Sequence, residues 1–560
     1  MRVADFFCGA GGFSEGFRTA GFEVVFGLDN WKPAIDTHTL NHPHAKHYLG
    51  DILKIDVDQI DSIVPDTEVI AGSPPCVSFS YSNKAGKADK SLGTALIEKY
   101  FQIVAYKKHK NGSKLKYWLM ENVPNSAAYI KNRYTFEELG LPGGAAIALE
   151  IPIRNVFNAA DYGAPQTRSR FVCGDYPVPK PTKSEGRWTT MRQVMDALGD
   201  PLDKPKNKVK DVSWGFEITS DQLTDHRYDT RVEEFEWSTA KRLKTDHGFM
   251  GKMSFPEYLD RPSRTVMATQ SAISRESILF GTRDPDTYRL PTIREIASFM
   301  SFPITYQFEA GSEGAKYRLV GNAVCCKLSC ALGMAINERE GIEASEPVFP
   351  ILKASVDLTG RRTRERKRAS RKSSAKFRMH VPYLKVSSLR VDLDNLASDF
   401  GTGEIAWRAV LHRGSGKKAI HSVPSIESSR AALESADLAR LESNLKVAFS
   451  DSGTLTASSM QSAYVGNDGE RLGPEKALAL IKKTVDETFP EEDYSDQLVS
   501  LEESDFCIGR DTLPVRIAAA LYSCQWLIER MNSVAVRSPL PSVVAQEPAQ
   551  VGRRIRLHPS

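Results

Sequence analysis

Short apolar runs alternate with helical stretches along the first part of the chain. The runs are of strand type, and each ends at glycine, proline or a polar residue; they lie at residues 2–7, 22–28, 69–71, 117–120 and 151–157. Helical spacing follows at residues 14–20 and 91–108. Strands that alternate with helices pair in parallel, with the helices on both faces of the sheet. Residues 1 to about 173 therefore predict an α/β fold with a doubly wound, mostly parallel sheet.

The alternation stops after residue 174, and the pattern then changes several times. Residues 175–260 mix lysine and arginine with tryptophan, which suits either a polyanion groove or a solvated loop domain. Strand character returns at residues 261–267 and helical character at 292–302. Beyond residue 341 we expect strands at 377–391 and 405–412 and helices at 425–449, 474–489 and 514–534. This C-terminal part shows no internal repeat and reads as an α+β extension.

These changes divide the chain into expected domains. We predict a catalytic domain at 1–174 that resumes at 261–340, a small domain at 175–260, a basic linker at 341–376, a C-terminal domain at 377–538 and a disordered tail at 539–560. The linker is expected because residues 361–376 carry nine basic residues and one acid, and such runs are usually solvated.

Composition limits the class of protein. A chain of 560 residues is too long for one core. The net charge of +4 is too small to indicate a nucleic-acid partner by itself. Eight cysteines without CxxC spacing indicate reduced thiols. We expect no membrane span, because no apolar run looks long enough to cross a bilayer, and the N-terminus does not read as a signal peptide.

The stretch at residues 69–80, Val-Ile-Ala-Gly-Ser-Pro-Pro-Cys-Val-Ser-Phe-Ser, is the strongest chemical signal. A strand ends near Ala71, and two prolines then stiffen the turn that leads to Cys76. Ligands of open α/β sheets bind beyond the carboxyl ends of strands, so Cys76 is a candidate nucleophile. The alternative, a small buried thiol, is the commoner case for a lone cysteine.

A glycine turn follows the first strand. Cys8-Gly-Ala-Gly-Gly-Phe-Ser14 lies between a strand and a helix, which lets a ligand approach the backbone at a helix N-terminus. Such turns also serve close helix packing. Asp29 stands about 20 positions later, where a carboxylate binds a ribose hydroxyl in nucleotide-binding folds, or it caps the next helix. Asp51-Ile52 follows at another strand end.

Polar residues at two further strand ends are candidates for the same cleft. Glu121 ends an apolar strand before a proline turn, as an acid in the cleft or as a capping carboxylate. Gln166, Arg168 and Arg170 alternate and therefore share one face of an extended segment. Arginines there suit phosphate and base oxygens, although a solvated edge strand is the commoner explanation.

Taken in order, these motifs resemble the cytosine-C5 DNA methyltransferase family. The matching segments are residues 5–14, Ser-Pro-Pro-Cys at 73–76 with Phe79-Ser80, Glu-Asn-Val at 121–123, Gln-Thr-Arg-Ser-Arg at 166–170, Arg-Pro-Ser-Arg-Thr at 261–265 and Gly-Asn-Ala-Val at 321–324. Six motifs in one order are specific, and they cover residues 1 to about 335. Two positions depart from the family pattern: Val77 stands where glutamine is common, and Asp29 where glutamate is usual.

The resemblance implies a Rossmann-like methyltransferase and assigns roles to the candidates. Cys76 would add to C6 of cytosine, Glu121 would hold the exocyclic amine and N3, Arg170 would reach O2, and Arg168 a phosphate or the catalytic loop. The implied methyl donor is S-adenosylmethionine, and no metal is needed. The expected cofactor contacts are Phe7 at the adenine, Gly9 and Gly11 at the methionine part, Asp29 at the ribose, Asp51 and Ile52 at the adenine edge, and Asn322 and Val324 closing the pocket.

The same resemblance implies a partner and a setting. The substrate would be double-stranded DNA with the target base flipped out, and residues 78–92 would form a loop that closes over it. Residues 175–260 would form the target-recognition domain. We expect a sequence-specific enzyme of the restriction-modification type that acts as a monomer on DNA, with a cognate restriction endonuclease as a candidate partner. In a bacterium it would be cytoplasmic and nucleoid-associated.

Alternatives of other classes remain open. A tRNA cytosine-5 methyltransferase shares this catalytic core but typically carries a Cys-Phe-Thr signature, which we do not find. A catalytically silent DNA-binding regulator is opposed by the intact set of Cys76, Glu121 and Arg170. Residues 341–560 carry no catalytic signature, and a nuclease, a partner-binding module and a DNA clamp are the alternatives for this region; we expect auxiliary DNA or partner binding.

Overall fold

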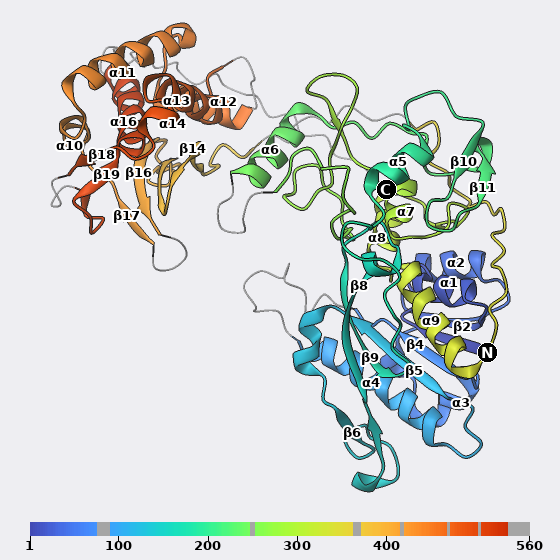
Figure 1. The fold of residues 1–560 in the computed structure, drawn as a ribbon. Coiled ribbons are helices and arrows are strands. Elements are labelled where there is room, and N and C mark those ends of the chain that lie inside the picture. The colour runs from blue at the N-terminus through green and yellow to red at the C-terminus, as the bar shows by residue number, and fades with distance from the viewer. Residues whose placement is uncertain are drawn as a thin grey trace, which may run out of the picture. The chain divides into compact units, whose positions relative to one another are not determined.

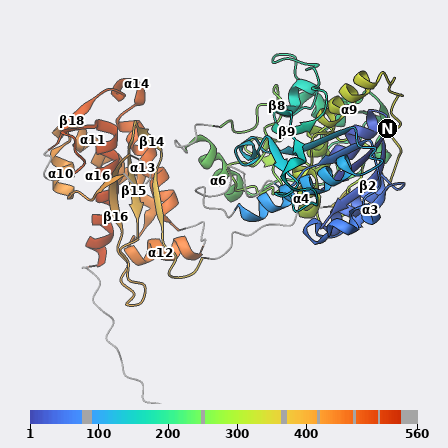
Figure 2. The same cartoon turned by 90° about the horizontal axis from the view of Figure 1, so that it is seen from below.

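The computed structural model describes residues 1–75, 90–246, 253–361, 371–414, 419–466, 471–501 and 506–535. The chain divides into two compact units, which are treated separately below. Unit 1 comprises residues 1–245 and 252–366, and unit 2 comprises residues 246–251 and 367–560 (Figures 1 and 2). Cys76, the predicted nucleophile, and most of the predicted closing loop lie outside the described residues.

A seven-stranded sheet forms the centre of unit 1. Its order is β3 (Lys46–Leu49), β2 (Glu23–Asp29), β1 (Arg2–Phe6), β4 (Val69–Gly72), β5 (Tyr117–Asn122), β9 (Ser169–Asp175) and β8 (Ile153–Asn158). The first five strands run parallel, and β9 and β8 are antiparallel to their neighbours. The chain steps from β1 outwards in both directions. This topology confirms the predicted doubly wound, mostly parallel sheet.

Both faces of this sheet are buried. In β4, Val69 and Ala71 belong to the core cluster that includes α1 (Gly12–Thr19) and α9 (Cys326–Glu340). Ile70, between them, belongs to the cluster that includes α4 (Ser91–His109). Successive side chains of a strand point to opposite faces, so an uninterrupted apolar run is what a sheet covered on both sides requires.

The remaining elements of unit 1 are short. They are α2 (Lys32–Asn41), α3 (Ile60–Ile63), β6 (Arg133–Thr135), β7 (Ala148–Glu150), α5 (Met191–Leu198), β10 (Lys208–Lys210), β11 (Glu217–Thr219), α6 (Glu234–Thr245), β12 (Phe280–Gly281), β13 (Tyr288–Arg289), α7 (Ile293–Phe299) and α8 (Glu313–Asn322). The strand expected at residues 261–267 is wrong: this segment contributes only an isolated bridge between Ser263 and Gln166.

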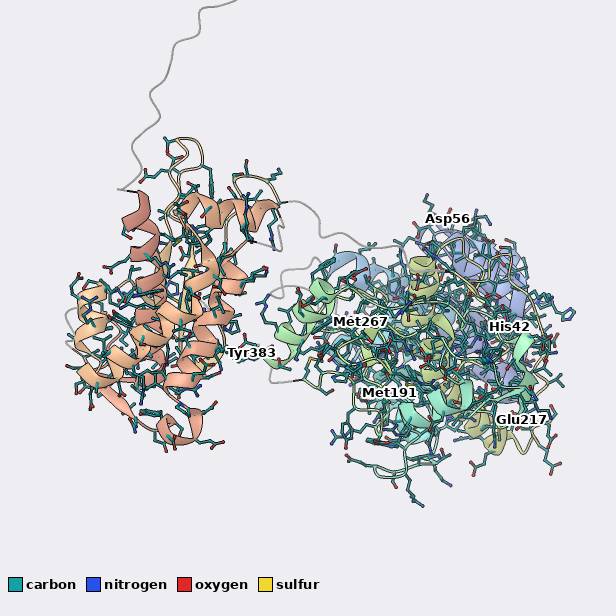
Figure 3. All side chains as sticks on the ribbon, turned by 90° about the horizontal axis from the view of Figure 1, so that it is seen from above. His42, Asp56, Met191, Glu217, Met267 and Tyr383 are labelled. Carbon is teal, nitrogen blue, oxygen red and sulfur yellow. The ribbon has the colours of Figure 1, made fainter. Side chains whose placement is uncertain are left out.

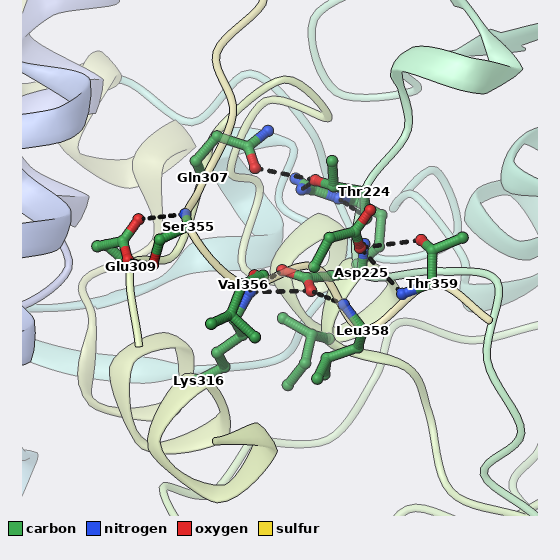
Figure 4. A network of polar contacts seen from close by, with 12 residues as sticks. Thr224, Asp225, Gln307, Glu309, Lys316, Ser355, Val356, Leu358 and Thr359 are labelled. Carbon is green, nitrogen blue, oxygen red and sulfur yellow. Dashed lines mark hydrogen bonds and ion pairs between the residues drawn. The ribbon is translucent and has the colours of Figure 1, made fainter. Parts of the chain in front are cut away.

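Residues 345–361 pack on unit 1 as an extended strap. Phe349 stacks on Phe216 with ring centroids 4.3 Å apart. Leu358 N–H donates to Asp225, and Lys316 donates to the Val356 carbonyl (Figure 4). The range predicted as a solvated linker therefore includes a packed segment. The expectation failed because the strap is held by buried partners elsewhere in the chain, which its own composition does not reveal.

Unit 2 contains an antiparallel sheet in the order β14 (Arg378–Val386), β15 (Leu389–Asp394), β16 (Arg408–Arg413) and β17 (Ile420–Ser422). Its other elements are α10 (Ile426–Ala431), α11 (Ser435–Ala448), α12 (Ala457–Gly466), α13 (Pro474–Thr488), α14 (Glu491–Tyr494), β18 (Leu498–Ser500), β19 (Thr512–Pro514) and α16 (Val515–Ala535). The single strand expected at 377–391 is a hairpin, and the helix expected at 425–449 is two helices.

Among the residues that the structure describes, one segment, residues 313–340, is long and apolar enough to span a membrane. The expectation that no apolar run is long enough was therefore wrong on length. In the structure the segment consists of α8 and α9, and 72% of its most apolar 18 residues are buried inside unit 1. A buried core helix explains its apolar composition.

Candidate active site

A cavity of about 390 Å³ opens at the carboxyl ends of the parallel strands. Residues from four strand ends line it: Phe7 after β1, Asp29 in β2, Ser73 after β4 and Glu121 in β5. The cavity also contacts Gly9, Asp51, Ile52, Arg168, Arg170 and Asn322. Most of the residues singled out in the sequence therefore face one space, at the place where open α/β sheets bind ligands.

The glycine turn forms one wall of the cavity. Phe7, Gly9 and Gly11 have φ values of 56°, 52° and 84°. A Cβ on Gly9 would meet nothing closer than 3.9 Å, so the backbone is open to the cavity there. A Cβ on Gly11 would instead overlap the Tyr306 hydroxyl. Gly11 does not line the cavity and serves close packing, and its expected place at the methionine part of the cofactor stays a prediction.

Asp29 is fixed by backbone donors. Its carboxylate accepts hydrogen bonds from Gly9 N–H at 3.0 Å and from Trp31 N–H at 2.9 Å. Burial raises the pKa of Asp29, and these hydrogen bonds act in the opposite direction. Asp51 accepts from Leu53 N–H at 3.0 Å and so caps the short turn that contains Ile52. Both carboxylates are held in place at the edge of the cavity.

The two residues expected to close the pocket are placed differently. Asn322, at the end of α8, lines the cavity. Val324 is buried and does not line it. Its carbonyl lies where a Cβ on Gly12 would stand, so Val324 packs the start of α1 against the chain before α9. Val324 therefore supports the turn from behind.

Glu121 and Arg170 form an ion pair inside the cavity wall. Arg170 Nε lies 2.8 Å from Glu121 Oε1, and their side chains are 11% and 9% exposed. Burial raises the pKa of Glu121, although Arg170 and Arg168 act to lower it. The protonated carboxyl is thus favoured more than in water, which suits a group that must donate or share a proton.

Arg168 is directed inwards. Its terminal nitrogens donate to the carbonyls of Val266, Gly321 and Ala323, each at 3.1 Å. The residue is 4% exposed. Arg168 therefore ties the segment after the Arg-Pro-Ser-Arg-Thr motif to the end of α8. Its guanidinium thus positions the cavity wall, and the expected contact with a phosphate or with the catalytic loop stays a prediction.

The proline turn before Cys76 is held by the elements on either side. Ser73 N–H donates to the Phe6 carbonyl at 3.0 Å, and Ser73 Oγ donates to the Phe7 carbonyl at 3.2 Å. Asn122 Nδ2 donates to the Pro74 carbonyl at 3.0 Å. Ser73, Pro74 and Pro75 all line the cavity. The structure therefore shows why asparagine follows Glu121, a role that the sequence alone did not reveal.

Several lining residues were not predicted. Trp31 lies in the wall, and the Arg318 guanidinium lies 4.6 Å from the centre of its ring. Thr265 to Ala268 contribute a further wall; Met267 of this group is labelled in Figure 3. An aromatic residue two positions after Asp29 was the available signal for Trp31, whereas Arg318 carries none in the sequence.

A buried polar chain supports the glycine turn from below. Ser14 Oγ lies 2.8 Å from Asp5 Oδ2 and 2.8 Å from His38 Nε2, and His38 Nδ1 lies 2.8 Å from His47 Nε2. Asp5, Ser14 and His38 have no exposed surface. Burial raises the pKa of Asp5 to about 7 and lowers the pKa of His38. This row of hydrogen-bonded side chains links the end of β1 to the half-buried His47.

The cavity fits a nucleoside-containing cofactor. Apolar walls at Phe7, Ile52 and Leu28 suit a purine ring, a fixed carboxylate at Asp29 suits a ribose diol, and the open backbone at Gly9 admits a polar chain. The volume lies within the range of about 300–1,000 Å³ that small-molecule pockets occupy. The fold and this site define a Rossmann-like enzyme that uses a nucleoside cofactor.

Comparisons with known proteins specify the class further. Residues 1–338 match the family model for C-5 cytosine-specific DNA methylase. Type II methyltransferase M.MthTI of Methanothermobacter thermautotrophicus is 29% identical over 360 residues, covering 61% of this chain and 99% of the relative. M.HgiGI of Herpetosiphon aurantiacus is 45% identical over 97 residues, covering 17% of this chain and 72% of the relative.

Among solved structures, the S. pombe Dnmt2 methyltransferase has a TM-score of 0.40 at 18% identity, covering 61% of this chain and 100% of that chain. The family model covers more than half of the chain, so the protein belongs to the C-5 cytosine-specific DNA methylase family. It is a DNA (cytosine-5-)-methyltransferase that acts on DNA with S-adenosylmethionine as methyl donor. The predicted family, activity and cofactor are confirmed.

Proposed function

We propose that this enzyme methylates a flipped cytosine through a covalent adduct with Cys76. Pro75, which lines the cavity, directly precedes Cys76 in the chain. The observation that supports the proposal best is the Glu121–Arg170 ion pair in the same cavity wall as the Ser73-Pro74-Pro75 turn. A carboxyl and a guanidinium beside the turn that leads to Cys76 suit attack on a pyrimidine edge.

The proposed chemistry assigns one task to each side chain. The Cys76 thiolate forms a bond to C6 of cytosine, and the electron pair of the C5–C6 double bond moves towards N3 and C5. Glu121 holds N3 and the exocyclic amine, and Arg170 holds O2, so the charge that develops on the ring is stabilised. When bound, S-adenosylmethionine would supply an electrophilic methyl group to C5, and S-adenosylhomocysteine would leave as the S–CH3 bond breaks. Loss of the C5 proton to a base then restores the double bond and releases the thiolate.

The cofactor contacts follow from the cavity walls. Phe7, Asp51 and Ile52 would hold the adenine, Asp29 the ribose and Gly9 the methionine part. Asn322 would close the space from the side of α8. Trp31, packed by Arg318, joins this set as an additional aromatic wall. Val324 and Gly11, which do not line the cavity, would keep these groups in position, and Arg168 would fix the wall that it lines.

The substrate specificity is also a proposal. Residues 175–260 would recognise the target sequence in duplex DNA, and the enzyme would act as a monomer. Its curated relatives are named type II methyltransferases, which supports a role beside a restriction endonuclease of the same specificity. Sequencing of methylated cytosines in a host that expresses the chain would identify the site. Methylation without sequence preference would contradict this role.

A substitution at the nucleophile tests the mechanism. Cys76→Ser should abolish transfer of tritiated methyl groups to duplex DNA, while calorimetry should show unchanged cofactor binding. The wild type should label duplex DNA and leave tRNA unlabelled. If Cys76→Ser still turned over, the covalent role would be refuted. If the wild type bound DNA without transferring methyl groups, the chain would be a silent regulator.

A further inference from the structure

The antiparallel sheet of unit 2 has two chemically different faces. The inward positions Leu389, Val391 and Leu393 of β15 are fully buried in the core of this unit. Helices α13 and α16 pack on that side. The positions between them point to the opposite face, and these are Arg390, Asp392 and Asp394.

Cations occupy most of the opposite face. The strand register aligns Arg378 with Asp394 and Arg408, and Lys385 with Arg390 and His412. We call Arg378, Lys385, Arg390 and Arg408 together the arginine face. Asp394 is aligned with Arg378 and Arg408, and Asp392 is aligned with His380 and Val410. Against these two carboxylates, the four cations leave a surplus of two positive charges. His380, at the edge strand, pairs with Asp246 at 2.9 Å and is not counted.

The two carboxylates lie beneath the cations. Arg378 and Arg390 contact Asp392 at 2.9 and 3.0 Å, and Arg408 contacts Asp394 at 3.0 Å. The aspartate side chains are 4% exposed, whereas those of Arg378 and Arg408 are 38% exposed. Hydrogen bonds from His412 and Arg378 hold the pKa of Asp392 below its usual value, against the effect of burial. The anions are thus covered, and the cations form the accessible surface.

The guanidinium groups keep donors for a ligand. Arg390 uses only Nε in its bond to Asp392, and its two terminal nitrogens have no hydrogen-bond partner among the described residues. Nη1 of Arg378 and Nη1 of Arg408 likewise have no hydrogen-bond partner among the described residues. A guanidinium held by a buried carboxylate loses less freedom on binding than a mobile one. Such groups suit the oxygens of phosphate, which they can contact through two nitrogens.

We propose that the arginine face of unit 2 binds the phosphate backbone of duplex DNA, apart from the base that is methylated. The inference goes beyond the methyltransferase reaction and depends only on DNA being the substrate. A polyanion complements the surplus of accessible positive charge. Contacts to phosphate carry no sequence information, so this surface adds affinity at any sequence and leaves the choice of the target base unchanged.

The test measures binding of the full-length enzyme to a fluorescent duplex that lacks the methylation site, over a range of salt concentrations. Lys385→Ala with Arg390→Gln removes two cations, while Asp392 keeps Arg378 and His412 as partners. The logarithm of affinity against the logarithm of salt should lose about 0.9 in slope for each phosphate contact removed. Lys446→Ala with Lys483→Ala, two exposed cations on α11 and α13, is the matched control and should keep the wild-type slope.

A second variant separates a specific contact from net charge. Arg408→Gln with Asp394→Asn removes a cation together with the anion beneath it, so the net charge is unchanged. Affinity for the duplex should still fall several-fold, because an accessible guanidinium is lost. Far-ultraviolet circular dichroism and the melting temperature establish that each variant is folded. Wild-type affinity and slope in both folded variants would overturn the proposal. This is also the result expected if the face binds an acidic protein instead of DNA.

Discussion

Arg170 Nε contacts Glu121 Oε1 at 2.8 Å across two antiparallel neighbours, β9 and β5. The pair joins residues 49 positions apart in the chain at one end of the cofactor cavity. Since both side chains are almost fully buried, each fixes the position of the other, and Arg170 opposes the rise that burial causes in the pKa of Glu121. The Glu121 carboxyl and the Arg170 guanidinium are therefore expected to act together in the reaction.

The first prediction concerns the Glu121–Arg170 ion pair. Glu121→Gln keeps the size of the side chain and removes its ability to ionise. We expect kcat for methyl transfer to fall by about 10²–10⁴-fold, the usual contribution of a general acid or base. Cofactor affinity, measured by calorimetry, should change little. A loss of cofactor affinity with unchanged kcat would show that Glu121 acts in binding instead.

The second prediction compares two glycines of the same turn. Gly11→Ala should destabilise the protein strongly, because its Cβ would overlap the Tyr306 hydroxyl and φ is 84°. Gly9→Ala meets open space at φ 52° and should cost only about 1–2 kcal/mol of folding free energy. Its methyl group would enter the cavity, so cofactor affinity should fall. Urea unfolding and calorimetry separate the two effects, and equal losses of stability would contradict the assignment.

The doubly wound, mostly parallel sheet and the position of the cavity could be predicted from the sequence because both follow from local patterns. Uninterrupted apolar runs such as residues 69–71 identified strands buried on both faces, and polar residues after them identified the ligand-binding edge. Glu121, Asp29 and Gly9 were found in this way. Their neighbours in space are also near strand ends in the sequence, so no long-range information was needed.

Residues that act through long-range contacts could not be predicted in the same way. Arg168 was expected at a phosphate or at the catalytic loop, and its contacts with carbonyls about 100 and 150 positions further along the chain were not predicted. Arg318 reaches Trp31 only through the fold. The strap at 345–361 was predicted as linker from composition, and its anchor, Asp225, lies 133 positions before Leu358. Composition describes a segment, whereas these roles depend on what the segment meets.

The third prediction concerns pH. Burial raises the pKa of Asp5 to about 7, against hydrogen bonds from Ser14, and Asp29 adds to the rise. Cys8 and Tyr100 also lie near Asp5, and burial raises the pKa of each. A carboxyl whose folded pKa is raised loses stability as pH increases from its unfolded pKa of about 4 to its folded pKa. The wild type should therefore lose stability between about pH 4 and pH 7.

Asp5→Asn removes this ionisation while keeping an oxygen that accepts from Ser14. As pH rises through this window, the variant should become more stable relative to the wild type. The difference in unfolding free energy should reach roughly 4 kcal/mol above pH 7, since each pKa unit corresponds to about 1.4 kcal/mol. The difference between the two urea unfolding curves, measured from pH 4 to pH 8, cancels the contribution of other groups. If the difference in unfolding free energy between the two proteins does not depend on pH, the pKa of Asp5 is not raised in the folded protein.

The last prediction concerns the buried ion pair that holds the strap. Lys316 Nζ contacts the two Asp225 oxygens at 2.9 and 2.7 Å, and neither side chain is exposed (Figure 4). Asp225 also accepts from Leu358 N–H at 3.0 Å. Lys316→Met leaves this carboxylate buried without its cation, which typically costs about 3–5 kcal/mol. We expect a loss of that size in urea unfolding.

Lys32→Met is the control, because the Lys32–Asp36 pair is 69% and 36% exposed and should be worth less than about 1 kcal/mol. Limited proteolysis adds a second measurement. If Asp225 is the anchor, Lys316→Met should expose residues 345–361 to cleavage at a protease concentration that leaves the wild type and the Lys32 variant intact. Equal resistance in all three proteins would show that Phe349 and the backbone hydrogen bonds hold the strap without this pair.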